Sequence, residues 1–133
     1  RVSWDAERDA QPTVMGVSMF APAGKTHLEI SIGEESRKLN ADGGRLTLGR
    51  SRDADLAVND TRVSRLHAAI EWVGGHFILS DASSFGTWVY FGNQPEPVVL
   101  RRTECYLVGH GWISLGCDRN SDDAPLASFT VVS

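Results

Sequence analysis

Three residue types that carry out chemistry gather in one short stretch of this chain. Asp60, Ser64 and His67 supply a carboxylate, a hydroxyl and an imidazole, the three groups of a hydrolytic triad. A triad requires the imidazole to contact the serine hydroxyl, with an oxyanion hole opposite. Clustering on one short stretch does not provide that geometry, and no nucleophile-elbow pattern surrounds Ser64. The stretch therefore does not predict an enzyme.

A phosphate-binding loop is a second candidate in the same region. Residues 44–51 read Gly-Arg-Leu-Thr-Leu-Gly-Arg-Ser, close to a nucleotide P-loop with Arg50 in the lysine position. Such a loop follows a strand and opens a helix whose first turn faces the phosphates. Here residues 46–48 are themselves typical of a strand, and residues 51–58 carry no helical pattern. The context argues against nucleotide binding.

Two further groups of residues resemble metal ligands. Cys105, His110 and Cys117 have a spacing that matches no compact zinc site, and no fourth ligand lies nearby in the sequence. Residues 118–122 begin like a calcium loop but lack its central glycine and its closing glutamate. We expect free thiols and a solvated acidic loop, with no metal and no other cofactor.

Arginine is concentrated in the stretch that holds the serine and the histidine. Residues 45–67 contain five arginines and three acidic residues, a net charge of +2, whereas the whole chain carries −4. Loop arginines can grip a phosphate dianion because the planar guanidinium makes two parallel charge-assisted hydrogen bonds. The five arginines are Arg45, Arg50, Arg52, Arg62 and Arg65.

Short runs of alternating polar and apolar residues surround these positions. His27–Ile32 is the clearest, and similar runs recur at spacings of about 8 to 12 residues with Gly, Asn or Asp between them. Gly74 and Gly75 separate two such runs and predict a two-residue hairpin turn. The expected strands are residues 13–20, 27–32, 45–48, 67–73, 76–80, 87–91, 98–100, 105–108, 112–115 and 127–132.

This pattern predicts an all-β fold, an antiparallel β-sandwich. Trp72, Trp88 and Trp112 fall inside expected strands, so we expect them to pack in the core. The length of 133 residues fits one domain. We assign residues 1–12, which are polar, to a linker or the exit from a preceding domain, and residues 13–133 to the domain itself.

Composition and charge exclude several function classes. An acidic chain has no electrostatic footprint for nucleic acid or for an anionic membrane surface. No apolar run approaches the roughly 18 to 20 residues needed to cross a bilayer. The chain starts at Arg1 with no signal segment, so we expect a cytoplasmic piece of a longer protein.

The order of several short motifs resembles one known family, the forkhead-associated (FHA) domain. Residues 48–51 (LGRS), 63–68 (VSRLHA) and 81–87 (DASSFGT) are similar to its Gly-Arg, Ser-x-x-His and Asn-Gly motifs on successive loops. Residues 112–116 (WISLG) look like its late strand, and the resemblance covers about residues 28–132. The resemblance implies a β-sandwich of about eleven strands that binds phosphothreonine peptides at the loops of one end.

The resemblance also implies a role for each motif residue. Gly49 would shape the turn that presents Arg50, and Arg50 would contact the phosphopeptide. Ser64 would donate its hydroxyl to the phosphate, and Arg65 would add a phosphate or backbone contact. His67 would brace the loop without touching the ligand.

Two further positions are expected to affect peptide binding. Arg62 is expected to favour an acidic side chain near the phosphothreonine by charge pairing. Phe85, just before Gly86, stands where the family has an asparagine that holds the peptide backbone with both its donor and its acceptor. Phenylalanine supplies neither, and the loss would cost about 1–3 kcal/mol, roughly ten- to a hundredfold in affinity.

We therefore expect a non-catalytic module that reads phosphothreonine in a signalling protein. Its partner would be a phosphothreonine-containing protein or peptide, in another protein or in the same polypeptide. The alternative is a phosphate-independent interaction or dimerisation module, which an exposed Phe85 would favour because a lone apolar group at a loop tip often marks a contact patch. Residues 83–89 and 100–105 resemble FHA modules of bacterial class III adenylate or guanylate cyclases, so this alternative includes regulation of an attached cyclase domain.

Overall fold

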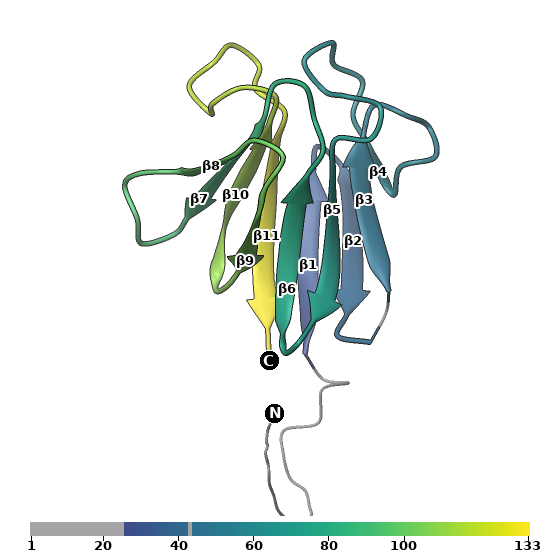
Figure 1. The fold of residues 1–133 in the computed structure, drawn as a ribbon, viewed down its shortest axis with the longest axis vertical. Coiled ribbons are helices and arrows are strands. Elements are labelled where there is room, and N and C mark those ends of the chain that lie inside the picture. The colour runs from purple at the N-terminus through teal and green to yellow at the C-terminus, as the bar shows by residue number, and fades with distance from the viewer. Residues whose placement is uncertain (1–25, 43) are drawn as a thin grey trace, which may run out of the picture.

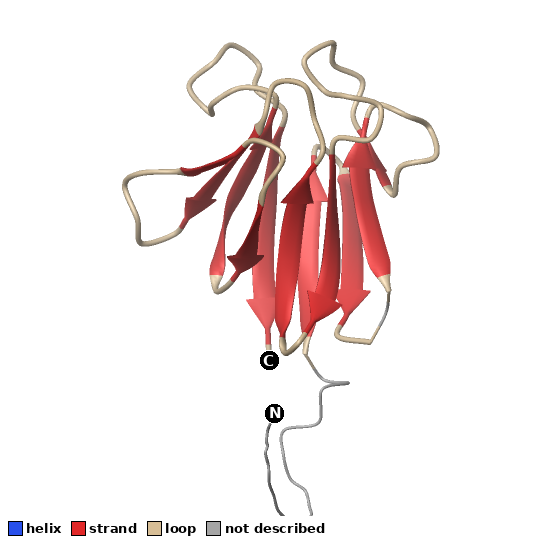
Figure 2. Ribbon diagram, in the orientation of Figure 1, coloured by secondary structure: helices blue, strands red, loops and turns tan. Residues whose placement is uncertain are grey.

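The computed structural model describes residues 26–42 and 44–133. These residues form eleven strands and no helix, which confirms the all-β prediction (Figures 1 and 2). The expected linker at residues 1–12 and the expected strand at residues 13–20 lie outside the described residues. The strands are β1 (His27–Ile32), β2 (Glu35–Asn40), β3 (Arg45–Gly49), β4 (Leu56–Ala57), β5 (Ala68–Val73), β6 (His76–Asp81), β7 (Thr87–Phe91), β8 (Val98–Leu100), β9 (Glu104–Leu107), β10 (His110–Leu115) and β11 (Leu126–Val132).

Two sheets make up the sandwich. One has six strands in the order β2-β1-β11-β10-β7-β8, and the other has five in the order β4-β3-β5-β6-β9. In the described residues every strand pair is antiparallel except β3 with β4, which is parallel and two residues long. Val73 pairs with His76, so Gly74 and Gly75 form the expected two-residue turn, with φ of +60° and +92°.

Two strands were not predicted, and both lie at the edge of a sheet. β2 has the sequence ESRKLN, in which Leu39 alone is buried, so it lacks the alternation of a half-buried strand. Its charged residues suit an edge strand, because exposed charges prevent pairing with another chain. β4 is too short to produce any period, and it forms only because β3 lies beside it.

The core lies between the two sheets and draws on both. In the six-stranded sheet Leu28, Ile30 and Phe129 are inaccessible to solvent, and in the five-stranded sheet Ile70 and Leu79 are equally buried. In β1, β6 and β11 buried positions alternate with more exposed ones, whereas the first three residues of β5, which include Ile70, are all buried. No helix in the described part of the chain is long and apolar enough to cross a membrane.

The expectation for the tryptophans is only partly met. Trp72 packs against the core, with its ring edge on the Phe77 ring at a centroid distance of 4.8 Å. Trp112 is 38% exposed, because Ile113 takes the inward position next to it and the strand alternates. Trp88 is half-buried and lies beneath the guanidinium of Arg101, so it is not a core residue either.

Most of the long loops lie together at one end of the sandwich (Figure 1). This end carries the loops β3–β4, β4–β5, β6–β7 and β10–β11, whereas the β5–β6 hairpin turn and the C-terminus lie at the other end. The antiparallel order brings residues 50–55, 58–67 and 82–86 side by side although they are separated in the sequence. The residues expected to bind a ligand lie on these loops.

Candidate functional site

Gly49 ends β3 at a point where two backbones touch. A Cβ atom at this position would overlap the carbonyl oxygen of Arg65, so only glycine allows the approach. The contact lets the Arg50 N–H donate to the Ser64 carbonyl at 2.9 Å and the Ser51 N–H donate to the Arg65 carbonyl at 3.2 Å. The close approach at Gly49 places the backbone of Arg50 beside that of Ser64.

The Arg50 side chain is exposed and partly fixed. Its Nε donates to the Val63 carbonyl at 3.0 Å, which orients the guanidinium. The four N–H donors of its two terminal nitrogens have no partner among the described residues. Neither Arg50 nor the exposed Arg65 forms an ion pair with any carboxylate among the described residues. Both charges are therefore available to an anion.

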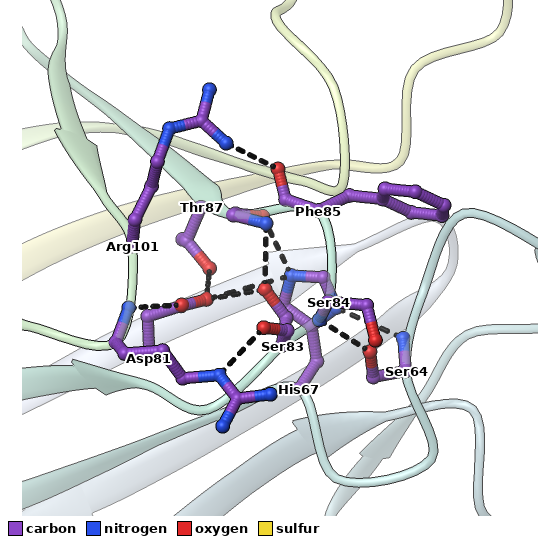
Figure 3. Close-up of polar contacts among 10 residues, drawn as sticks. Ser64, His67, Asp81, Ser83, Ser84, Phe85, Thr87 and Arg101 are labelled. Atoms are coloured by element: carbon purple, nitrogen blue, oxygen red, sulfur yellow. Dashed lines mark hydrogen bonds and ion pairs between the residues drawn. The ribbon is translucent and has the colours of Figure 1, made fainter.

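Ser64 offers one hydroxyl proton to a ligand. Its Oγ accepts a hydrogen bond from the backbone N–H of Ser84 at 3.0 Å, so the oxygen is positioned while its proton remains free to donate (Figure 3). Ser64 lies on the β4–β5 loop and Ser84 on the β6–β7 loop. This hydrogen bond joins the two loops at the site.

His67 connects the same two loops from the interior of the sandwich. It is completely buried; its Nδ1 accepts from the Ser64 N–H at 3.0 Å and its Nε2 donates to the Gly86 carbonyl at 2.9 Å (Figure 3). Burial lowers the pKa of His67, although the Gly86 carbonyl and the charge of Asp81 act the other way. The imidazole is therefore neutral, with its proton on Nε2.

A buried carboxylate organises the β6–β7 loop, and sequence analysis gave it no role. Asp81 Oδ1 accepts from the hydroxyls of Ser83 and Thr87, both at 2.6 Å (Figure 3). Burial alone would raise the pKa of Asp81, but these hydrogen bonds and one from the Arg102 backbone outweigh it and hold the pKa below its usual range. The spacing Asp-x-Ser at the end of an alternating strand is typical of a side-chain-capped turn, and that signal could have found it.

Hydrogen bonds between Asp55 and Thr47, which sequence analysis also missed, fix the shape of the β3–β4 loop. The Asp55 carboxylate accepts from the backbone N–H of Thr47 at 2.8 Å and from its hydroxyl at 3.2 Å. The Thr47 hydroxyl in turn accepts from the Asp55 N–H at 3.0 Å. The eight-residue separation of the partners follows no local pattern, so only the fold reveals the pair.

Arg62 is engaged within the protein. Two of its N–H donors bind the Asp60 carboxylate, at 2.9 and 2.7 Å, and two more bind the carbonyls of Asp122 and Asp123 at 2.9 Å each. Hydrogen bonds from Arg62 lower the pKa of Asp60 to about 2. Arg62 thus ties the β4–β5 loop to the β10–β11 loop, and its contact with an acidic ligand residue stays a prediction.

The described structure assigns other roles to the residues that resembled catalytic or metal sites. Both nitrogens of His67 are occupied by backbone groups, so His67 makes no hydrogen bond to the Ser64 hydroxyl. No group of three or more His, Cys, Asp or Glu side chains among the described residues is arranged to hold a metal. Cys105 and Cys117 are unbridged, and burial raises the pKa of the Cys105 thiol to about 11.

Phe85 lies at the tip of the β6–β7 loop with 55% of its surface exposed. Its carbonyl accepts a long hydrogen bond, 3.4 Å, from Arg101, and its ring projects away from that arginine (Figure 3). The residue that replaces the expected asparagine is therefore an apolar side chain in solvent, next in the chain to Ser84, whose N–H binds the Ser64 hydroxyl.

The described chain is thus an antiparallel-rich β-sandwich with a cationic site built on loops at one end. Residues 46–108, a little under half of the chain, match the model of the FHA domain. The matched residues contain the three loop motifs on which the sequence resembles this family. No curated protein matches the sequence.

Solved structures of FHA domains share this fold. The FHA-1 domain of Mycobacterium tuberculosis Rv1747 is similar with a TM-score of 0.62 and 22% identity, over 82% of this chain and 99% of that one. A structure from an analysis of phosphothreonine-dependent FHA domain interactions gives a TM-score of 0.55 and 26% identity, over 80% and 96% of the two chains. The FHA domain of human APLF, in complex with an XRCC1 bisphospho peptide, gives 0.58 and 22%, over 80% and 98%.

Proposed function

We propose that this domain is a non-catalytic module that binds phosphothreonine peptides at the loop end of the sandwich. The observation that carries the proposal is the pairing of Arg50 with Ser64. The backbone N–H of Arg50 donates to the Ser64 carbonyl at 2.9 Å, and within residues 26–42 and 44–133 both side chains have donors with no acceptor. A guanidinium and a hydroxyl side by side match the three acceptor oxygens of a phosphate.

Arg65 and His67 complete the proposed mechanism. The Arg65 charge lies on the same loop as Ser64 and adds to the attraction for a dianion, while the buried His67 holds the Ser64 backbone in place. Support also comes from similar FHA structures that concern phosphothreonine-dependent interactions or contain a bisphospho peptide.

The test is fluorescence anisotropy with a degenerate phosphothreonine peptide library and its unphosphorylated counterpart. We expect phosphate-dependent binding that falls at least tenfold in Arg50→Ala and in Ser64→Ala, because each removes a charge-assisted hydrogen bond of about 1.5–3 kcal/mol. Arg37→Ala, on strand β2 and outside the site loops, is the matched control and should bind as the unmodified protein does. Unchanged affinity in Arg50→Ala, with the fold intact by circular dichroism, would contradict the proposal.

A second candidate rests on the exposed Phe85 ring. A lone apolar group at a loop tip suits a phosphate-independent protein contact or self-association. Binding that is equal for phosphorylated and unphosphorylated peptides, or light scattering that shows dimers lost in Phe85→Ser, would favour this candidate. Regulation of an attached cyclase domain remains a prediction to be checked in the full-length protein.

A further inference from the structure

Two consecutive arginines lie directly beside the proposed phosphate site on a loop that the proposed function does not use. Arg101 and Arg102 follow β8, and each reaches back to the β6–β7 loop. Arg102 Nε donates to the Ser83 carbonyl at 2.9 Å, and Arg101 Nη1 donates to the Phe85 carbonyl at 3.4 Å (Figure 3). Between these two carbonyls lies Ser84, whose N–H binds the Ser64 hydroxyl. The two arginines therefore flank the side of the β6–β7 loop opposite Ser64.

Both arginine side chains are held in place by the protein. The backbone N–H of Arg102 donates to the buried Asp81 carboxylate at 2.8 Å, and Arg102 adopts a φ of +61°, which is uncommon for a residue with a side chain. Backbone conformations of this kind persist where the surroundings enforce them, and they cluster at ligand-binding sites. The Arg101 guanidinium lies 5.5 Å from the centroid of the Trp88 ring, a cation–π contact that restricts it without neutralising its charge.

Neither charge is neutralised within the described part of the chain. No carboxylate there forms an ion pair with Arg101 or Arg102, and both residues are exposed. Arg62 differs, because four of its N–H donors are taken by Asp60 and by two carbonyls. Arg101 and Arg102 each retain four N–H donors, enough for bidentate binding of an anion.

We propose that Arg101 and Arg102 form a second anion-binding subsite for another acidic group of the same phosphothreonine peptide. This inference rests on the proposed function. A peptide whose phosphothreonine is held by Arg50 and Ser64 crosses the β6–β7 loop at Ser84 and Phe85 to reach the pair. The group it presents is a carboxylate of Asp or Glu, or a second phosphate, since a guanidinium binds both through paired oxygens. The affinity from this subsite compensates for the peptide-backbone hydrogen bonds that an asparagine would make and that Phe85 cannot make.

The experiment compares four peptides by fluorescence anisotropy at low salt. One carries phosphothreonine with neutral flanks, one adds a glutamate, one adds a second phosphothreonine, and one is unphosphorylated. The added group is placed in turn at each position on both sides of the phosphothreonine. The spacing between the two acidic groups decides whether a peptide can reach both subsites at once. Each peptide is measured on the unmodified domain, Arg101→Gln, Arg102→Gln, the double variant and the control Arg37→Gln, whose arginine lies on β2.

At one or more positions we expect the added acidic group to strengthen binding by about three- to tenfold in the unmodified domain and in Arg37→Gln. The gain should disappear in the double variant, and it should shrink as salt rises because exposed charge pairs are screened. Arg102→Gln removes the Nε donor to the Ser83 carbonyl, whereas Arg101→Gln leaves that hydrogen bond intact. Arg101→Gln therefore tests the subsite even if Arg102→Gln unfolds. Comparing the gain from an added phosphothreonine with the gain from an added glutamate shows which of the two acidic groups the subsite prefers.

Two results would overturn the inference in different ways. If the neutral phosphopeptide binds in an Arg50-dependent manner but the added acid brings no gain, or the gain survives in the double variant, the second subsite is wrong and the proposed function stands. If no peptide binds in a phosphate-dependent manner, the proposed function fails and the subsite fails with it.

Discussion

At the residue scale, His67 determines how two loops meet. Its side chain is wholly buried and bonds to backbone groups of Ser64 and Gly86, which are far apart in sequence. The Gly86 carbonyl also accepts from the Gly116 N–H at 2.9 Å, so the same point holds a third loop. A buried residue thereby fixes the backbone that carries the Ser64 hydroxyl.

The buried state of His67 predicts a pH dependence of stability. Its pKa is lowered in the folded protein from an ordinary value of 6.5, so below that pH the unfolded chain takes up a proton that the folded one does not. The free energy of unfolding should therefore fall as pH drops below about 6.5, by at most about 1.4 kcal/mol per pH unit. Asp81, whose pKa is lowered from 3.8, acts only at more acidic pH.

Urea unfolding at a series of pH values between 7.5 and 4.5 tests this prediction. His67→Gln is the control, since the other three histidines are common to both proteins and their contribution cancels in the difference. The variant should be less stable at pH 7 but show a shallower pH dependence. Parallel curves for the two proteins would show that His67 does not bring about the effect.

At the scale of the elements, the end of β3 is shaped by contact with the β4–β5 loop. The Cβ atom of an alanine at Gly49 would overlap the carbonyl group of Arg65, which is part of the backbone and cannot move aside cheaply. We expect Gly49→Ala to destabilise the domain by about 1–3 kcal/mol and to weaken phosphopeptide binding at least tenfold. Gly33→Ala, with φ of +60° but open space around it, should cost about 1 kcal/mol and leave binding unchanged.

These two variants separate steric contact from backbone strain. Chemical denaturation reports stability, and anisotropy with the best phosphopeptide reports the site. If Gly49→Ala binds as tightly as the unmodified domain, the close approach of the loops is not needed to present Arg50.

The β6–β7 loop depends on the buried Asp81 in the same way. Asp81→Asn replaces one acceptor oxygen with an NH₂ group that faces donors, so at least one hydroxyl or N–H loses its partner. We expect a loss of about 2–3 kcal/mol in the free energy of unfolding, together with weaker phosphopeptide binding. Glu104→Gln removes an exposed carboxylate with one hydrogen bond to Ser80 and should change stability by less than about 0.5 kcal/mol. Equal effects of the two substitutions would refute the role given to Asp81.

At the scale of the whole molecule, the sandwich separates its two ends. The candidate site occupies the loop end, while the Gly74-Gly75 turn and the C-terminus occupy the other (Figure 1). The core between them is contributed by both sheets. Changes at the far end should therefore leave the site unaltered.

An insertion experiment checks this separation. A short Gly-Ser insertion between Gly74 and Gly75 should keep phosphopeptide affinity within about twofold, because long surface loops cost little to close. The same insertion after Arg62 should abolish binding, since it displaces Ser64 from Arg50. Loss of binding in the first variant, with the domain still folded, would mean that the two ends are coupled.

Much of the fold could be predicted because period-2 alternation reports which side of a strand is buried. His27–Ile32, Thr87–Phe91 and Val98–Leu100 were predicted with the bounds that the structure has. The polar edge strand β2 and the short parallel β4 were missed, because neither has an alternating pattern and both depend on a neighbouring strand. Trp112 was misplaced because alternation shows that two faces exist but not, for a single residue, which face is covered.

The sequence by itself determined the all-β class, the order of the loop motifs, and the replacement of an amide by Phe85. These are properties of residue type and local spacing, which a chain shows without folding. Tertiary structure decided that Arg62 is engaged by Asp60, that Asp81 holds the β6–β7 loop, and that Arg101 and Arg102 lie beside Ser64's partner loop. Such contacts join residues brought together by strand pairing, so their existence depends on distances in space that no local pattern encodes.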